Sequence, residues 1–222
     1  MKLTFISDTH GYHDKLELGI GNFLFHCGDV SGRGSEREVR KFLKWFDNIS
    51  TFDHKIFIAG NHDFIFERQP EKIREIISEY PSVTYLEDES IEIWGFKIFG
   101  TPWQPWFHNW AFNLPREGLE LKEKMNNIPI DTDILLTHSP PHMILDRVIN
   151  RPENVGCKYM IDKVLEVNPI VHCFGHIHEE YGSRRFHDTL FLNASSIDVN
   201  YNISNKPFEL ELDIERKTVN FI

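Results

Sequence analysis

The chain has 222 residues, 41% of them hydrophobic and 26% charged, which suits a single globular domain spanning residues 1–222. No apolar run approaches the roughly 20 residues that a membrane-spanning helix needs, and the N-terminus reaches a charged motif at Asp8, so we expect a cytoplasmic protein. The net charge of -10 disfavours binding to nucleic-acid backbones, which depends on many Lys and Arg contacts. Three cysteines without C-x-x-C spacing argue against a disulfide framework and against a cysteine-ligated zinc site.

Short apolar runs and amphipathic stretches alternate along the chain. The apolar runs predict buried strands at 3–7, 22–27, 55–59, 134–137 and 170–174. Apolar residues at helical spacing predict helices over 36–49, 70–79 and 158–167. From 83 to 100 the apolar residues alternate around a turn at Trp94 and Gly95, which predicts a hairpin, and 193–212 is expected to add strand and loop. Strands alternating with helices predict an α/β fold.

Polar side chains stand directly after five of the predicted strands. In chain order they are Asp8 and His10, then Asp29, then Asn61, His62 and Asp63, then His138, and last His176 and His178. Because sites in open α/β sheets form beyond the carboxyl ends of the strands, we expect these groups to converge on one rim. Glycines at 11, 28, 60 and 175 adjoin them and would allow tight turns and close approach of the backbone.

The residue types in this set predict a metal site. Carboxylate, amide and imidazole groups without a thiolate suit Mn, Fe, Zn or Co. Seven such ligands exceed the needs of one ion but suit two ions when one carboxylate bridges them. Two metal ions about 3.5–4 Å apart form a clamp for in-line displacement at phosphorus. We therefore expect two divalent metal ions, with Mn favoured, and a small phosphoester substrate.

The ordered blocks D-x-H, G-D, G-N-H-[DE], [GT]-H and G-H-x-H resemble those of the calcineurin-like metallophosphoesterases. The stretches at 100–113 and 192–202 are similar to a small branch of that family, the metallophosphoesterase-domain-containing proteins. The resemblance implies two mixed β-sheets packed face to face and flanked by helices in a four-layer sandwich. It also implies a phosphodiesterase rather than a phosphomonoesterase, because the branch is usually described that way.

The resemblance further implies a role for each residue of the site. Asp8, His10 and His178 would hold the first ion, Asn61, His138 and His176 would hold the second, and Asp29 would bridge both. His62, with Asn61 beside it, would meet the substrate phosphate and protonate the leaving oxygen. Some members of the branch lack one histidine of the last block and are catalytically weak, so the intact G-H-I-H at 175–178 favours turnover.

One position departs from the protein-phosphatase branch of the family. There the G-D block continues into an aspartate that orients the catalytic histidine and an arginine that grips phosphate. This chain has Gly32 at the aspartate position and keeps Arg33, which weakens an assignment as a protein phosphatase. We therefore expect Arg33 to bind substrate and Asp63 to orient His62.

Other polar and aromatic residues have structural interpretations. The aromatic cluster around His108 is expected in the core, with a stacking platform for a nucleotide base as the alternative. Histidines 13, 54, 142 and 187 are expected on the surface or in loops, whereas 26 and 172 either orient ligands or bond to backbone in the core. The three consecutive acidic residues at 87–89 predict a solvated turn. Arginines 184 and 185 either touch a phosphate or pair with the acidic residues at 179 and 180.

The favoured function is hydrolysis of a small, nucleotide-like phosphoester, without a membrane partner and with the oligomeric state left open. One alternative is a nuclease of the same family, which would share every metal ligand but would need a cationic groove. Another is a catalytically weak metal-binding scaffold, although such relatives usually lose His62 or a metal ligand, and none is missing here.

Overall fold

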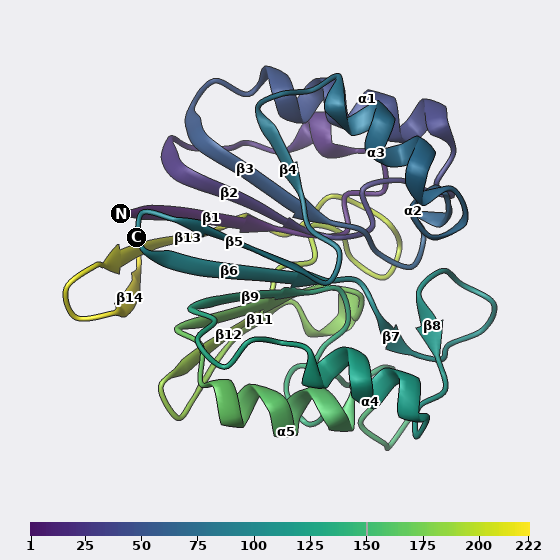
Figure 1. Cartoon of the computed structure of the whole chain (residues 1–222), viewed down its shortest axis with the longest axis vertical. Helices are drawn as coiled ribbons and strands as arrows, with labels where there is room; N and C mark the ends of the chain where they lie inside the picture. Colours follow the sequence, from purple (N-terminus) through teal and green to yellow (C-terminus); the bar gives the residue numbers. More distant parts are fainter. Residues whose placement is uncertain (150) are drawn as a thin grey trace.

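The computed structural model describes residues 1–149 and 151–222, whose strands form two mixed sheets of six strands each (Figure 1). In pairing order, the first sheet contains β14 (Thr218–Phe221), β13 (Phe208–Asp213), β1 (Lys2–Ile6), β2 (Gly21–Cys27), β3 (Phe52–Ile58) and β4 (Val83–Tyr85). The second contains β11 (Gly182–Phe186), β12 (Thr189–Asn193), β10 (Val171–Phe174), β9 (Ile134–Thr137), β6 (Phe96–Thr101) and β5 (Glu89–Ile93). A short pair stands apart from both sheets and consists of β7 (Gln104–Pro105) and β8 (Asn113–Leu114).

Helices cover the outer face of each sheet, as Figure 1 shows. The first sheet carries α1 (Glu36–Asn48), α2 (Phe64–Arg68) and α3 (Pro70–Ser78), and the second carries α4 (Leu119–Asn126) and α5 (Lys158–Val167). Two short 3-10 helices span His13–Lys15 and His178–Glu180. The layers run helix, sheet, sheet, helix, which confirms the four-layer α/β sandwich predicted above.

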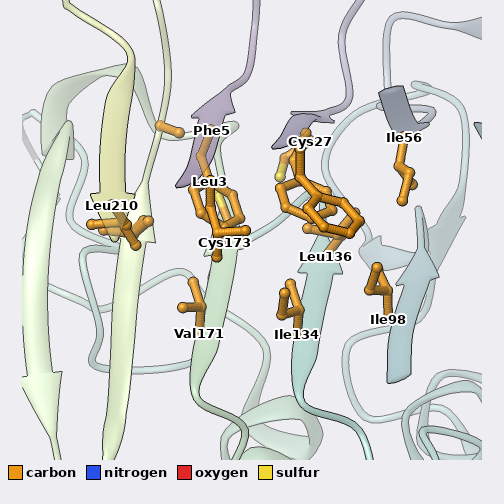
Figure 2. Packing of buried hydrophobic residues seen from close by; sticks show 14 of the residues in the cluster. Leu3, Phe5, Cys27, Ile56, Ile98, Ile134, Leu136, Val171, Cys173 and Leu210 are labelled. Atoms are coloured by element: carbon orange, nitrogen blue, oxygen red, sulfur yellow. The ribbon is translucent and has the colours of Figure 1, made fainter. Parts of the chain in front are cut away.

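The two sheets bury an apolar layer between them (Figure 2). Leu3 and Phe5 of β1 face Val171 and Cys173 of β10, and all four side chains are fully buried. Burying one large apolar side chain stabilises a fold by about 1.5–3 kcal/mol. Because side chains alternate between the two faces of a strand, the outward residues of the same strands pack beneath the helices. The layer between the sheets thus holds the strand ends of both sheets in one arrangement.

Local sequence signals set the helix ends. The hydroxyl of Ser35 accepts a hydrogen bond from the Glu38 amide, while the Glu38 carboxylate accepts one from the Ser35 amide, which forms a capping box at the start of α1. The buried face of α1 consists of Val39, Phe42, Leu43 and Phe46. All three helices predicted from the sequence are observed, each within one residue of its expected bounds.

Some segments differ from the sequence expectation. Val83–Tyr85 does not belong to the hairpin, because it pairs with β3 at the edge of the first sheet. The hairpin consists of β5 and β6, with Trp94 and Gly95 in left-handed backbone at its turn (φ 53° and 79°). Three features were not predicted, because short or polar segments give weak periodicity: α2, α4 and the β11–β12 pair.

Parallel strands bring the polar motifs together. β1, β2 and β3 are parallel to one another, and β9 is parallel to β10, so their carboxyl ends lie at one edge of the sandwich. The Ser196 amide, beyond β12, donates to the carbonyl of Ser7, beyond β1, at 2.8 Å. This hydrogen bond joins the two sheets beside the predicted site. In the described part of the chain, no helix has the length and apolar character needed to cross a membrane.

Candidate metal centre

The first predicted group of ligands is assembled at this edge. Asp8, His10 and His178 each offer a ligand atom within 4.8 Å of the others, and His178 Nε2 lies 3.4 Å from Asp8 Oδ1. His10 is only 8% exposed, and neither of its ring nitrogens has a hydrogen-bond partner. Buried polar groups are normally paired, so an unpaired imidazole facing two carboxylates suits a cation ligand. The donor set therefore fits a divalent metal.

Asp29 lies at the middle of the cluster. Its Oδ2 is 3.6 Å from His10 Nε2 and 3.4 Å from His138 Nε2, so one carboxylate reaches both predicted groups. Asn61 Oδ1 is 2.9 Å from the same nitrogen of His138. His138 donates from Nδ1 to the carbonyl of Cys27 at 2.9 Å, which directs Nε2 toward Asp29. The His176 ring completes this side, with its centroid 5.1 Å from that of His138.

The backbone that presents these residues is strained. Asp8, His10, Asp29 and His176 have φ values of 50°, 43°, 54° and 67°, a region that non-glycine residues rarely adopt. Such strain persists only where surrounding contacts impose it, and it concentrates at functional sites. Gly175 shows how closely the chain approaches itself here, because a Cβ at this position would lie 1.9 Å from Asp8 Oδ2.

The charge states within the cluster differ from residue to residue. Burial acts to raise the pKa of Asp8, but the hydrogen bond with His178 and the charge of His138 outweigh it and hold this pKa well below its usual range. Burial lowers the pKa of His10 to about 4 and, together with the charge of His138, lowers that of His176 to about 3. Burial acts to lower the pKa of His138 and of His178, but Asp29 raises the pKa of His138 to about 10 and Asp8 raises that of His178 above its usual range. Ionised carboxylates and neutral imidazoles are the forms that bind metals, so a bound cation would displace the proton from these two rings.

His62 stands beside the cluster and is fixed on three sides. Its amide donates to Asp29 Oδ1 at 2.7 Å, and its Nδ1 donates to the carbonyl of Gly32 at 2.7 Å. The ring stacks on Trp110 with centroids 4.0 Å apart and planes inclined by 25°. Its Nε2 faces Asp29 Oδ2 at 3.9 Å, and with His10 and Asp29 it forms a further group whose ligand atoms lie within 4.8 Å.

The expected contact between Asp63 and the His62 ring is not formed. The fully buried carboxylate of Asp63 instead accepts hydrogen bonds from the amides of Val30, Ser31 and Gly60 at 2.9–3.1 Å and from the Ser31 hydroxyl at 2.6 Å. Burial, followed by the charge of Asp29, raises the pKa of Asp63 to about 6. Asp63 therefore ties together the loops after β2 and β3. The backbone of Gly32, at the position where phosphatases carry an aspartate, orients His62.

A cavity of about 330 Å³ opens above the cluster. Asp29, Asn61, His62, His176 and His178 line its inner end. The side chain of Arg33 is exposed and is not among the residues that line this cavity, so the structure separates it from the other predicted substrate contacts.

The cavity wall contains aromatic residues that sequence reasoning placed in the core. Trp110 and Phe107 line the cavity, and Trp106 is 54% exposed, so the expected core position is wrong for these three. The aromatic segment lies at the cavity wall because β7 and β8 form a pair that is separate from the two sheets. The stacking platform was only the alternative interpretation of this segment.

Tyr201 was missed by sequence reasoning altogether. It lines the cavity and lies over two predicted ligands, with ring centroids 5.1 Å from His10 and 5.4 Å from His178. Its φ of 61° adds to the four strained residues of the cluster. The only sequence signal was the similarity of the 192–202 stretch to a family branch.

Other residues also differ from expectation. His13 is fully buried against Phe42 and Trp45 rather than on the surface. His26 and His172 bond to the hydroxyls of Thr9 and Thr137, both at 2.9 Å, rather than to backbone. Asp88 is not merely a solvated turn residue, since its carboxylate accepts from Thr101 and Trp103. Arg184 and Arg185 donate to the carbonyls of Met143 and Val219.

Comparison with known proteins extends these observations. A family model described as calcineurin-like phosphoesterase matches residues 1–180. Metallophosphoesterase domain-containing protein 1 of Homo sapiens is 38% identical over 234 residues, covering 96% of this chain and 71% of its own, and its Mus musculus counterpart gives the same values. The crystal structure of TT1561 of Thermus thermophilus has a TM-score of 0.68 and 11% identity, covering 100% of this chain and 97% of that one. The likeness to TT1561 concerns the fold alone.

Proposed function

The chain belongs to the calcineurin-like phosphoesterase family, and on that premise we propose that it is a phosphodiesterase for a small, nucleotide-like substrate. The family assignment supports a metal-dependent phosphoester hydrolase. The observation that carries the finer proposal is the stack of Trp110 on His62 at the wall of a cavity of about 330 Å³. Cavities of this size hold small ligands, and an indole face suits a planar base.

Among the described residues, no arginine lines the inner end of the cavity, which supports a diester over a monoester. A phosphomonoester is largely a dianion near neutral pH, whereas a diester carries one negative charge. Enzymes that bind the dianion commonly add an arginine that grips the phosphate in bidentate fashion. Arg33, the expected residue for that role, lies off the cavity. With no arginine at the inner end, the ions alone would offset the charge of the substrate, and a diester has the smaller charge to offset.

The predicted ligands keep the roles assigned to them above, with Asp29 shared between the two groups. Two divalent ions, when bound, supply Lewis acidity toward the phosphoryl group and toward water. Asp8 and Asp29 contribute the negative charge that such ions need, and Mn²⁺ is the favoured ion because imidazole ligands suit it better than Mg²⁺.

His62 is proposed to donate a proton to the leaving oxygen. The carbonyl of Gly32 accepts the hydrogen on Nδ1, so Nε2 is the nitrogen that faces the cluster and the substrate. The stack with Trp110 and the amide bond to Asp29 hold the ring in that orientation. A histidine positioned this way can act as a general acid near neutral pH.

Two diesters that share the p-nitrophenolate leaving group test the proposal. Thymidine 5′-(p-nitrophenyl phosphate) and methyl p-nitrophenyl phosphate differ only in the group that would reach Trp110. We expect chelated protein to be inactive, Mn²⁺ to restore activity at least as well as Mg²⁺, and kcat/KM to be at least about 10-fold higher for the thymidine ester. p-Nitrophenyl phosphate, the monoester, should be the poorer substrate.

Equal rates for the two diesters would contradict the nucleotide-like substrate, and faster hydrolysis of the monoester would contradict the diesterase. Hydrolysis of single-stranded DNA in preference to all three would favour the nuclease alternative. A protein that binds two ions yet turns over none of these substrates would favour the scaffold.

A further inference from the structure

Two arginines line the cavity at some remove from the predicted ligands. Arg116 follows β8, and Arg151 lies in the segment between β9 and α5. Arg116 donates from Nη1 to the carbonyl of Val155 at 2.7 Å, which anchors it to the segment that carries Arg151. Arg116 and the segment of Arg151 therefore belong to one side of the cavity, and the charge of Arg151 is close enough to act on Arg116.

Neither guanidinium has a carboxylate partner among residues 1–149 and 151–222. The arginines that form ion pairs with carboxylates in this part of the chain are Arg40, Arg74 and Arg216. Arg116 and Arg151 thus bring two positive charges that no ion pair offsets to the wall of one cavity, in a chain with a net charge of -10. Like charges brought together in this way favour the binding of an anion.

The electrostatics of Arg116 agree with this arrangement. Burial, and to a smaller extent the charge of Arg151, lowers the pKa of Arg116. An arginine still stays charged at any ordinary pH, so the repulsion is relieved by a counter-ion rather than by loss of a proton. The planar guanidinium presents paired donors that match the oxygens of a phosphate or a carboxylate.

An anion held by these two arginines would be separate from the phosphate that reacts. Arg116 and Arg151 are exposed at the cavity mouth, whereas Trp110 is half-buried and stacks on His62, where the mouth meets the inner end. The carboxylates of the inner end, Asp8 and Asp29, lie 3.4 Å from histidine nitrogens and form no ion pair with an arginine of the described chain. A group held by the two arginines therefore sits farther out than a phosphoester held by the predicted ligands.

We propose that Arg116 and Arg151 form a subsite for a second anionic group of the substrate, carried beyond the planar part that stacks on Trp110. The inference rests on the proposed phosphodiesterase function and narrows its substrate class to nucleotide-like diesters that bear a further phosphate or carboxylate. Specificity for such a substrate comes from the mouth, and cleavage comes from the inner end.

The decisive comparison uses thymidine 5′-(p-nitrophenyl phosphate) with and without a phosphate on its 3′ oxygen. In the wild-type protein, we expect KM to be at least about 10-fold lower for the ester with the 3′-phosphate than for the ester without it, with kcat little changed. This is the effect of one or two charge-assisted hydrogen bonds. The double variant Arg116→Gln/Arg151→Gln should lose this advantage and keep its KM for the ester without the phosphate. Arg147→Gln is the matched control, because Arg147 lines a neighbouring pocket and not this cavity.

A binding measurement separates this inference from the proposed function. Isothermal titration of the protein with thymidine 3′,5′-bisphosphate and thymidine 5′-phosphate should show the same preference of at least about 10-fold, again lost in the double variant. If this preference is found while none of the esters is cleaved, the proposed function fails and the subsite stands. If the esters are cleaved but the 3′-phosphate confers no advantage, the subsite fails and the function stands.

Two further results would overturn the subsite. Equal losses in kcat/KM for both esters in the double variant would show that the arginines hold the reacting phosphate. Inorganic phosphate that binds as tightly as the bisphosphate, with the same dependence on both arginines, would make the subsite one for free phosphate. Retention of most of the preference in Arg116→Lys/Arg151→Lys would support recognition by charge at this position.

Discussion

The inner end of the cavity and its mouth are built in opposite ways. Asp29, Asn61, His62, His176 and His178 line the inner end, and the other predicted ligands, Asp8, His10 and His138, lie within 3.6 Å of Asp29 or His178. These residues follow the ends of parallel strands, and strained backbone and mutual hydrogen bonds hold several of them in place. The mouth consists of Trp110, Phe107, Tyr201, Arg116 and Arg151, which come from connecting segments and are partly or largely exposed.

This difference indicates a division of labour. A rigid, buried cluster suits chemistry, which tolerates little displacement of the reacting groups. Loops on a rigid scaffold can vary in sequence without disturbing the core, and they commonly carry specificity. We therefore expect substitutions at the inner end to act on metal content and kcat, and those at the mouth to act on KM and on choice of substrate.

The largest effect is expected at Asp29, the carboxylate that reaches both ligand groups. Asp29→Ala should lower the bound metal at both positions, whereas His178→Ala should mainly affect the first and His138→Ala the second. Loss of a group that merely supports a ligand typically costs 10–100-fold in affinity or activity, so loss of this ligand should cost more than about 100-fold in kcat/KM. Metal content per chain and steady-state kinetics of the three variants provide the measurement.

Circular dichroism of the same variants serves as the control for folding. Retention of two ions per chain by a folded Asp29→Ala protein would disprove the bridging role.

The next effect concerns His62 and depends on the leaving group. General acid catalysis typically contributes 10²–10⁴-fold, and an alkoxide needs the proton far more than p-nitrophenolate does. His62→Ala should therefore slow cleavage of a dinucleoside monophosphate by about 10²–10⁴-fold but change cleavage of bis-p-nitrophenyl phosphate much less. Metal content should stay the same, as measured on the samples used for kinetics.

Equal losses on both substrates would assign His62 to phosphate binding alone. Loss of metal would make it a ligand, in keeping with the group that it forms with His10 and Asp29.

A smaller effect is expected for Trp110, where the mouth meets the inner end. Stacking of a base on an aromatic side chain is worth about 1–3 kcal/mol, so Trp110→Ala should raise KM for the thymidine ester by about 10-fold. Methyl p-nitrophenyl phosphate, which lacks the base, should be affected less, and Trp110→Phe should restore much of the difference. Should kcat fall equally for both esters, Trp110 would act by holding His62 and not by binding substrate.

The smallest effect is expected for Arg33. Surface substitutions away from special features usually change free energies by less than about 0.5 kcal/mol, so Arg33→Gln should change kcat/KM by no more than about 2-fold. The kinetics of the thymidine ester provide the measurement, with the arginine double variant as the positive control. A loss in kcat/KM above about 10-fold would show that Arg33 contacts the substrate and would contradict its position outside the cavity.

Much of the fold and the candidate cluster could be predicted from the sequence. The helices at 36–49, 70–79 and 158–167 have apolar spacing and caps that act within a few residues of chain, so local pattern was enough. The cluster could be predicted because each motif directly follows a strand, and parallel strands end at one edge. The order of the motifs gave the resemblance to a known family, the resemblance implied the four-layer arrangement, and both are confirmed.

Contacts between residues distant in the chain could not be predicted. Asp63 stands next to His62 in the sequence, yet its carboxylate bonds to amides 32 and 33 residues away, and the carbonyl of Gly32 orients the histidine. Every residue has a backbone carbonyl, so the amino-acid sequence cannot indicate which carbonyl takes the orienting role that a carboxylate has in the phosphatases. His13 is buried for a similar reason, because Phe42 and Trp45 of α1 pack over it.

The sequence by itself determined the inner end of the cavity, and the tertiary structure decided its mouth. Residues of the inner end adjoin strands, whose direction and pairing follow from apolar pattern and bring distant motifs to one edge. Residues of the mouth, such as Trp110, Tyr201, Arg116 and Arg151, lie in segments whose course depends on what they pack against. An aromatic residue or an arginine in such a segment can enter the core, face solvent or line a cavity. The tertiary packing of the segments decides which of these occurs.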